Sequence, residues 1–117
     1  MVLIIGASTK HQRYAYMATE RLLEKGHEVY LLAKREGEVL GQRIHTEMPQ
    51  AGSIDTVTLY VGPNHQEEYF SKIIDLKPRR VIFNPGTENS DLQQLLTDNG
   101  IEVEVNCTLV MLSLKNF

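Results

Sequence analysis

The chain has 117 residues, of which 23% are charged, and its formal net charge at pH 7 is −3. This length fits one domain, and the nearly balanced charge gives no electrostatic reason to expect nucleic acid or an anionic membrane as a partner. The single cysteine, Cys107, excludes an intramolecular disulfide framework and favours a reducing compartment, so we expect a cytoplasmic protein. The apolar N-terminal run is too short for a signal peptide or a membrane span, and we expect neither.

The start of the chain carries the strongest local signal. Residues 2–5 are apolar and run into Gly6 and a small, hydroxyl-rich turn, which is the pattern of a buried parallel strand. Apolar residues then recur at helical spacing until Gly26. We therefore predict a strand over residues 2–6 and a helix over about 12–25. The turn between them leads into a helix N-terminus, where free backbone N–H groups and the helix dipole favour phosphate.

Strand and helix patterns alternate along the rest of the chain. Further strands are predicted over 27–32, Asp55–Val61, Arg80–Phe83 and 101–105, with a short edge strand at Arg43-Ile44-His45. Two helices are predicted from capping-box patterns. The first begins at Asn64 with Glu67 and is closed by Pro78, the second begins at Ser90 with Gln93, and a terminal helix covers 108–114.

Five main β-type runs separated by helices favour a Rossmann-like fold, a doubly wound parallel sheet of five strands with helices on both faces. Ligands bind such sheets outside the carboxyl ends of the strands, where the strand order reverses. The polar, turn-rich segments of this chain follow the predicted strands at that end. They are Gly6–Arg13, Ala33–Arg35, Gly62–Asn64, Asn84–Asn89 and Asn106–Thr108. We therefore expect one ligand crevice.

The residues at this end restrict the kind of nucleotide. Of the glycines that form the dinucleotide fingerprint, only Gly6 is present. After the second strand, NAD-binding chains place an Asp or Glu that holds the ribose diol, whereas this chain has Lys34 and Arg35. Two cations there favour a ribose that carries an extra phosphate. The candidates are the 2′-phosphate of NADP and the 3′-phosphate of coenzyme A.

Several segments resemble, in order and along nearly the whole chain, the small stand-alone proteins of the CoA-binding domain family. These are similar in fold to the nucleotide-binding domain of the succinyl-CoA synthetase α subunit. The most specific segment is Asn84-Pro85-Gly86-Thr87-Glu88-Asn89, and the others are Gly6–Lys10, Arg21–Val29, Val39–Gly41 and Ile54–Val57. Members often carry Asn-Pro after the second strand, where this chain departs from the pattern with Lys34-Arg35.

The resemblance implies a site for coenzyme A or an acyl-CoA. Ser8, Thr9 and Lys10 would hold the pyrophosphate beside the small residues Gly6 and Ala7. Lys34 would meet the 3′-phosphate. The adenine or the pantetheine arm would pack on Val61 and Pro63, and the far side of the site would be lined by Asn84, Pro85, Gly86 and Thr87.

No pattern in the sequence points to catalysis or to a metal site. The histidines His11, His27, His45 and His65 lack metal-ligand spacing, Ser8 lies outside any nucleophile-elbow pattern, and Cys107 is interpreted as a small buried thiol. We therefore expect a non-enzymatic binding module that is a monomer or a weak homodimer. Two alternatives stay open: an NADP-dependent oxidoreductase, and an interaction or regulatory protein with a decayed nucleotide site.

Overall fold

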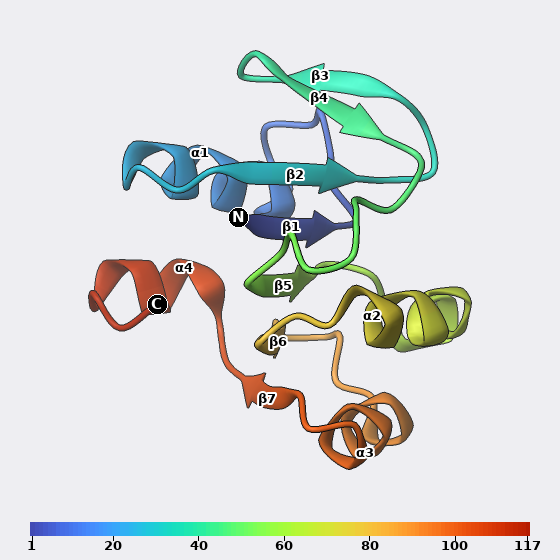
Figure 1. The fold of residues 1–117 in the computed structure, drawn as a ribbon. Coiled ribbons are helices and arrows are strands. Elements are labelled where there is room, and N and C mark those ends of the chain that lie inside the picture. Colours follow the sequence, from blue (N-terminus) through green and yellow to red (C-terminus); the bar gives the residue numbers. More distant parts are fainter.

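In the computed structural model, which describes residues 1–117, the chain folds around a seven-stranded sheet (Figure 1). The strand order is β3-β4-β2-β1-β5-β6-β7, and only β3 runs antiparallel to its neighbour. The strands are β1 (Val2–Ile5), β2 (Val29–Leu32), β3 (Gly37–Val39), β4 (Gln42–His45), β5 (Thr56–Leu59), β6 (Arg80–Phe83) and β7 (Glu102–Val105).

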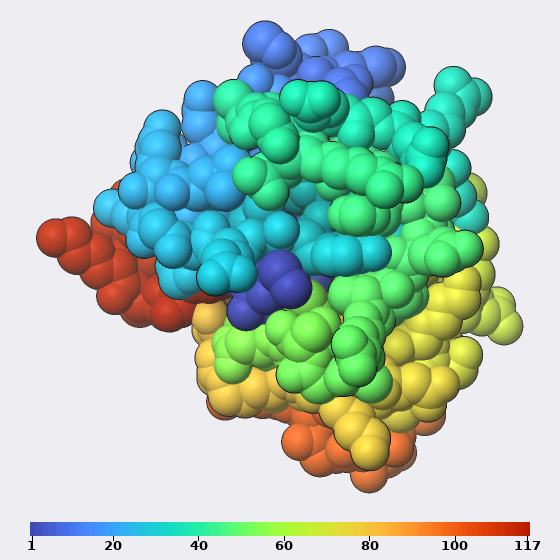
Figure 2. Space-filling view, turned by 45° about the horizontal axis from the view of Figure 1, so that its top comes forward, coloured from blue at the N-terminus to red at the C-terminus, as the bar shows by residue number.

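Helices cover both faces of the sheet, as Figure 1 shows. On one face lie α1 (Tyr14–Glu24) and α4 (Thr108–Ser113), and on the other lie α2 (Phe70–Leu76) and α3 (Ser90–Asp98). Two 3-10 turns, η1 (Pro63–His65) and η2 (Glu67–Tyr69), precede α2. In the space-filling view of Figure 2, the red C-terminal segment projects from an otherwise compact body. No helix has the length and the apolar character needed to cross a membrane.

Successive side chains of β1 point to opposite faces of the sheet and join a separate core on each face. Leu3 and Ile5 belong to the core under α2 and α3, whereas Val2 and Ile4 belong to the core under α1 and α4. None of these side chains is more than 4% exposed. Because both faces of β1 are buried, its sequence is an unbroken apolar run, as is typical of parallel strands between two helix layers.

The parallel part of the sheet, in the order β4-β2-β1-β5-β6-β7, follows the 3-2-1-4-5-6 pattern of doubly wound dinucleotide-binding sheets. The chain builds outward from β1 to β2 and β4, then crosses back to place β5 on the other side of β1. The strand order therefore reverses between β1 and β5. The loops that leave β1, β2 and β5 gather at this reversal, at the end of the sheet that we call the carboxyl edge.

The predicted count of five strands is wrong, because residues 37–45 form a hairpin. Strands β3 and β4 pair antiparallel through the turn Leu40-Gly41, whose φ angles are 51° and 80°. The segment Gly37–Val39 is too short to show an alternating pattern, so its sequence resembles a loop. The residues from Arg43 to His45 do form a strand, but β4 lies between β2 and β3 and not at the edge of the sheet.

The predicted start of the second helix is also wrong. Asn64 lies inside η1, and α2 begins only at Phe70, with no side-chain cap. The 3-10 turns replace the expected first helical turns because the chain here bends to bury the side chain of Gln66, which is 0% exposed. In this conformation the Nε2 of Gln66 donates to two backbone carbonyls, those of Val61 and Thr87.

Two other helices begin within one or two residues of the prediction. The cap of α3 is Asn89 and not Ser90: its Oδ1 accepts the N–H of Leu92 at 3.1 Å, and its own N–H donates to Gln93 Oε1 at 3.1 Å. The capping-box chemistry is therefore present but shifted by one residue. Helix α1 begins later than predicted because Arg13 has an extended backbone, with φ of −82° and ψ of 142°.

Candidate functional site

The loop of residues 6–10 leaves β1 at the centre of the carboxyl edge and is held against both neighbouring strands. Gly6 has a φ of 94°, and a Cβ atom there would lie 2.8 Å from the carbonyl oxygen of Tyr60. The N–H groups of Gly6 and Ala7 both donate to the Leu32 carbonyl, at 2.9 and 3.1 Å. Only glycine tolerates both the conformation and the close approach, so Gly6 fixes the path of this loop between the ends of β2 and β5.

The start of α1 follows this loop and offers hydrogen-bond donors to the same edge. Its N-cap, Arg13, makes no side-chain cap, and its first turn holds no acidic residue. The first N–H groups of a helix have no acceptor within the helix, and the helix dipole makes this end positive. The β1 loop and the helix start therefore favour a negatively charged group beside them.

Two adjoining pockets hollow the carboxyl edge. The large pocket, of about 850 Å³, is lined by the loop 6–10, by residues 33–36 after β2, by 60–62 after β5 and by most of the segment 64–69. The small pocket, of about 420 Å³, lies between the start of α1 and the segment Pro85–Thr87 after β6. The two pockets share a wall, formed by Gly6, Ser8, Lys10, Tyr60 and Gly62.

Most of the residues predicted for the site meet at these pockets. The large pocket brings together Lys34, Val61 and the predicted residues of the β1 loop, which are Gly6, Ala7, Ser8, Thr9 and Lys10. The small pocket adds Pro85, Gly86 and Thr87. Pro63 and Asn84 line neither pocket.

The side chain of Asn84 is turned into the protein and is only 2% exposed. Its Nδ2 donates to the Thr58 hydroxyl at 2.7 Å and to the Leu59 carbonyl at 2.8 Å. Its Oδ1 accepts the N–H of Thr108 at 2.8 Å. In this position the side chain fastens the end of β6 to β5 and to the start of α4.

Gln66 has a similar fastening role that no sequence pattern predicts. Its Nε2 donates to the Val61 carbonyl at 2.8 Å and to the Thr87 carbonyl at 2.7 Å, while its Oε1 has no partner. It thereby joins a wall of the large pocket to a wall of the small one. A glutamine within a polar stretch gives no sequence signal of burial, so only the structure identifies it.

The cations of the large pocket differ in whether they are already paired. Lys34 forms an ion pair with Glu68, and its Nζ lies 5.8 Å from the ring centroid of Tyr69. The hydrogen bond between them raises the pKa of Lys34 and lowers the pKa of Glu68. Lys10 and Arg35 line the same pocket and have no ion-pair partner. An anionic ligand therefore meets two free cations and one that is neutralised.

The chemically reactive side chains near this edge are few. Burial raises the pKa of Tyr60 to about 12, so its hydroxyl, which is shielded from solvent, is protonated at neutral pH. Cys107 is half-buried and not fully buried as expected, and it lines neither pocket. No group of at least 3 His, Cys, Asp or Glu side chains converges to hold a metal.

Comparison with known proteins assigns a family to this arrangement. An uncharacterized protein of known crystal structure is similar to this chain, with a TM-score of 0.96 and 51% identity over 99% of this chain and 96% of the other. A hypothetical protein from Pyrococcus horikoshii OT3 matches with a TM-score of 0.86 and 26% identity, over 97% of this chain and 81% of that one.

A more distant structure, from Thermus thermophilus, has a TM-score of 0.88 at 18% identity, over 99% of this chain and 89% of that one, and shows the fold alone. Among curated proteins, none matches this chain significantly. The sequence profile described as CoA binding domain matches residues 1–113. The resemblance suggested by the motifs is thereby confirmed, and the chain belongs to the CoA-binding domain family.

Proposed function

We propose that this protein is a binding module for coenzyme A or an acyl-CoA. The ligand binds at the carboxyl edge of the Rossmann-like sheet. The observation that carries the proposal is the position of the β1 loop. It forms the wall between two pockets, at the reversal of strand order, with the free cation Lys10 and an uncapped helix start beside it. Membership of the CoA-binding domain family supports the same ligand.

The two pockets suggest how an elongated nucleotide would lie. Its diphosphate would rest on the shared wall, where Ser8, Thr9 and Lys10 offer hydroxyl and ammonium groups. The adenosine half would fill the large pocket beside Val61, and the pantetheine arm would pass toward the small pocket and Gly86. Lys34 and Arg35, at the far end of the large pocket, would meet the 3′-phosphate.

We propose binding without turnover. Tyr60 lies on the shared wall with its hydroxyl buried, and burial raises its pKa to about 12, away from the neutral range in which a general base works. Lys34 and Glu68 are engaged with each other and do not form an acid and base facing a reacting group. The expected result is that the isolated protein leaves acyl-CoA thioesters and nicotinamide cofactors unchanged over hours, as followed by mass spectrometry of the ligands.

Titration calorimetry with the intact protein tests the binding proposal. Coenzyme A should bind, and at 100 times its dissociation constant it should stabilise the fold by about 2.7 kcal/mol in a parallel thermal scan. Lys10→Gln should weaken coenzyme A by roughly 1 to 2 kcal/mol, because a charge-assisted contact with the diphosphate is lost. The matched control is Lys25→Gln at the end of α1, which lines neither pocket and should leave the affinity unchanged.

The alternatives give different results in the same experiment. Binding of NADP in preference to coenzyme A would favour the oxidoreductase interpretation. If neither ligand binds, the nucleotide site has decayed and the proposal is wrong. Equal effects of Lys10→Gln and Lys25→Gln on affinity would show that the β1 loop does not hold the diphosphate.

A further inference from the structure

One ion pair is formed between two residues that line the large pocket, at the place where the ribose phosphate is expected. Lys34 follows β2 and Glu68 belongs to η2, so the pair joins two segments that are distant in sequence. Both residues line the pocket, and their side chains are 69% and 45% exposed. The Lys34 ammonium also approaches the ring of Tyr69. Lys34 is therefore the only cation of this pocket with an ion-pair partner, and that partner belongs to η2.

The other acids of the pocket do not act on its cations in this way. Glu36 pairs with Arg43, at 2.8 Å, and Arg43 does not line the pocket. Glu67 lines the pocket next to Glu68 in sequence but has no ion-pair partner. Glu68 is thus the only acid that already occupies a pocket cation.

From this contact we infer that Glu68 competes with the ribose phosphate of the ligand for Lys34 and so sets how strongly the site prefers a phosphorylated ribose. The inference rests on the proposed function. In the free protein the Glu68 carboxylate satisfies the Lys34 ammonium. When a ligand with a ribose phosphate binds, the carboxylate gives up that contact to the phosphate oxygens.

The physical reason is that the two anions cannot share one cation without cost. A phosphate monoester carries a charge of about −1.5 to −2 near pH 7, and a neighbouring carboxylate repels it. The Lys34–Glu68 pair is largely exposed, and such pairs are weak, so it corresponds to a factor of only about two to five in an equilibrium constant. Glu68 therefore reduces the gain in affinity that the ribose phosphate brings to the ligand, but it does not prevent the phosphate from binding.

The test compares two neighbouring variants with two ligands. Glu68→Gln keeps the shape of the side chain and removes its charge, and Glu67→Gln removes an unpaired charge from the same pocket. Each is titrated with coenzyme A and with 3′-dephospho-coenzyme A in a calorimeter. We expect Glu68→Gln to bind coenzyme A about two- to fivefold more tightly than the wild type, with little change for the dephosphorylated ligand. Glu67→Gln should change both affinities by the same factor.

A double-mutant cycle shows whether the effect passes through Lys34. In a Lys34→Gln background, the added change Glu68→Gln should improve the preference for coenzyme A by a clearly smaller factor, because only the direct repulsion between carboxylate and phosphate is then removed. The pair is exposed, so all variants should keep the wild-type unfolding midpoint, which a thermal scan verifies.

Three results would overturn the inference. One is an unchanged ratio of the two affinities in Glu68→Gln. Another is weaker binding of the dephosphorylated ligand, which would mean that Glu68 holds a ribose hydroxyl. The third is an improvement of undiminished size in the Lys34→Gln background. Loss of the proposed function has a separate signature, since the wild type and all variants would then bind neither ligand.

Discussion

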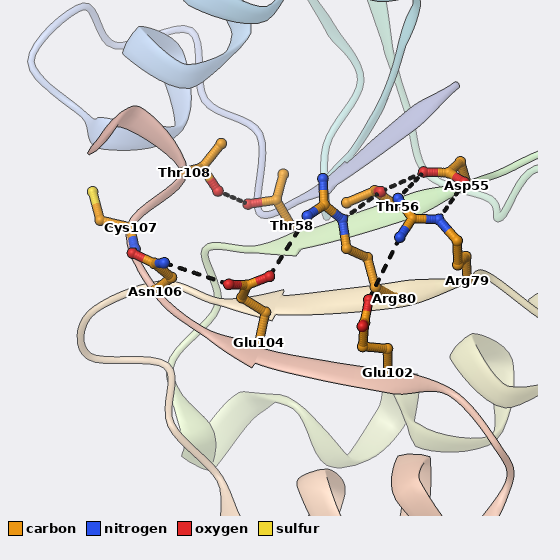
Figure 3. A network of polar contacts seen from close by, with 10 residues as sticks. All are labelled: Asp55, Thr56, Thr58, Arg79, Arg80, Glu102, Glu104, Asn106, Cys107 and Thr108. Carbon is orange, nitrogen blue, oxygen red and sulfur yellow. Dashed lines mark hydrogen bonds and ion pairs between the residues drawn. The ribbon is translucent and has the colours of Figure 1, made fainter. Parts of the chain in front are cut away.

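The charged side chains at the two ends of the sheet differ in how they are paired. At the end where the parallel strands begin, which we call the amino edge, Arg79 contacts Asp55 through two hydrogen bonds of 2.9 and 3.0 Å. Arg80, only 6% exposed, donates to Thr56 at 3.0 Å and lies 3.6 Å from Glu104 (Figure 3). At the carboxyl edge, Lys10 and Arg35 have no ion-pair partner. Both residues line the large pocket.

This difference separates charges that hold the fold together from charges that are free to hold a ligand. A buried guanidinium such as that of Arg80 must have partners within the protein, because an unpaired buried charge is costly. A cation beside an open pocket stays hydrated and loses little until an anion arrives. Lys34 is intermediate, since it lies at the carboxyl edge but already has a partner in Glu68.

The largest expected effect comes from Asn84, which lies at the carboxyl edge but is bonded as tightly as the residues of the amino edge. Asn84→Ala removes the partners of Thr58, Leu59 and Thr108 in the interior, and we expect it to lower the free energy of unfolding by about 3 kcal/mol. Urea denaturation measures this loss. The exposed Asn64, which makes no side-chain hydrogen bond, is the control, and Asn64→Ala should cost less than about 0.5 kcal/mol. Similar losses in both variants would contradict the structural role of Asn84.

The next effect tests the amino edge directly by comparing two adjacent arginines. Arg80→Ala should lower the free energy of unfolding by about 2 kcal/mol, because a buried, paired side chain that lies 4.6 Å from the Phe117 ring centroid is removed. Arg79→Ala, which breaks two largely exposed pairs, with Asp55 and Glu102, should lower it by less than about 1 kcal/mol. Neither change should alter the affinity for coenzyme A, as measured by calorimetry. A loss of affinity in either variant would show that the two edges are not independent.

Lys34 should give a smaller effect on ligand affinity than a free cation would. Lys34→Ala is expected to weaken coenzyme A by about 1 kcal/mol and to leave 3′-dephospho-coenzyme A nearly unaffected. The loss is at the low end for a charge-assisted contact because the wild-type lysine must first leave Glu68. Equal losses for both ligands, in the same titration, would mean that Lys34 does not contact the phosphate. In that case Arg35, which has no partner, becomes the residue to change.

The smallest effect concerns the pH dependence of stability at the amino edge. Hydrogen bonds from Arg79 lower the pKa of Asp55 from 3.8 to about 2. Since the folded-state pKa is the lower one, the stabilisation is present above about pH 3.8 and is lost as the pH falls toward 2. Both side chains are about half exposed, so we expect less than about 1 kcal/mol.

Chemical denaturation of the wild type and of Asp55→Asn, repeated between pH 2 and pH 6, measures this contribution. The difference in unfolding free energy should be nearly constant above about pH 5 and should decrease steadily from pH 4 to pH 2, where Asp55 is about half protonated in the folded protein. Arg79→Ala should remove the same pH dependence. A difference that grows toward low pH would have the wrong sign for a lowered pKa.

The sequence by itself determined the central elements and the edge at which the predicted site residues gather. The apolar run before Gly6, the helical spacing after it and the polar segments that follow successive strands all express local rules. Side chains buried on both faces of a strand must be apolar, and a chain that leaves a parallel strand must turn at the same end of the sheet. For this reason most residues predicted for the site meet at two adjoining pockets.

Only the tertiary structure decided which polar side chains face the pockets and which hold the loops in place. Glu68 reaches Lys34 across a separation of 34 residues, and Gln66 and Asn84 turn inward to fasten neighbouring loops. The hairpin β3–β4 likewise depends on the pairing of a three-residue segment that has no pattern of its own. The sequence of a loop has no periodic pattern from which the direction of a polar side chain can be predicted. That direction is fixed only when distant segments are packed together and each buried donor or acceptor must find a partner.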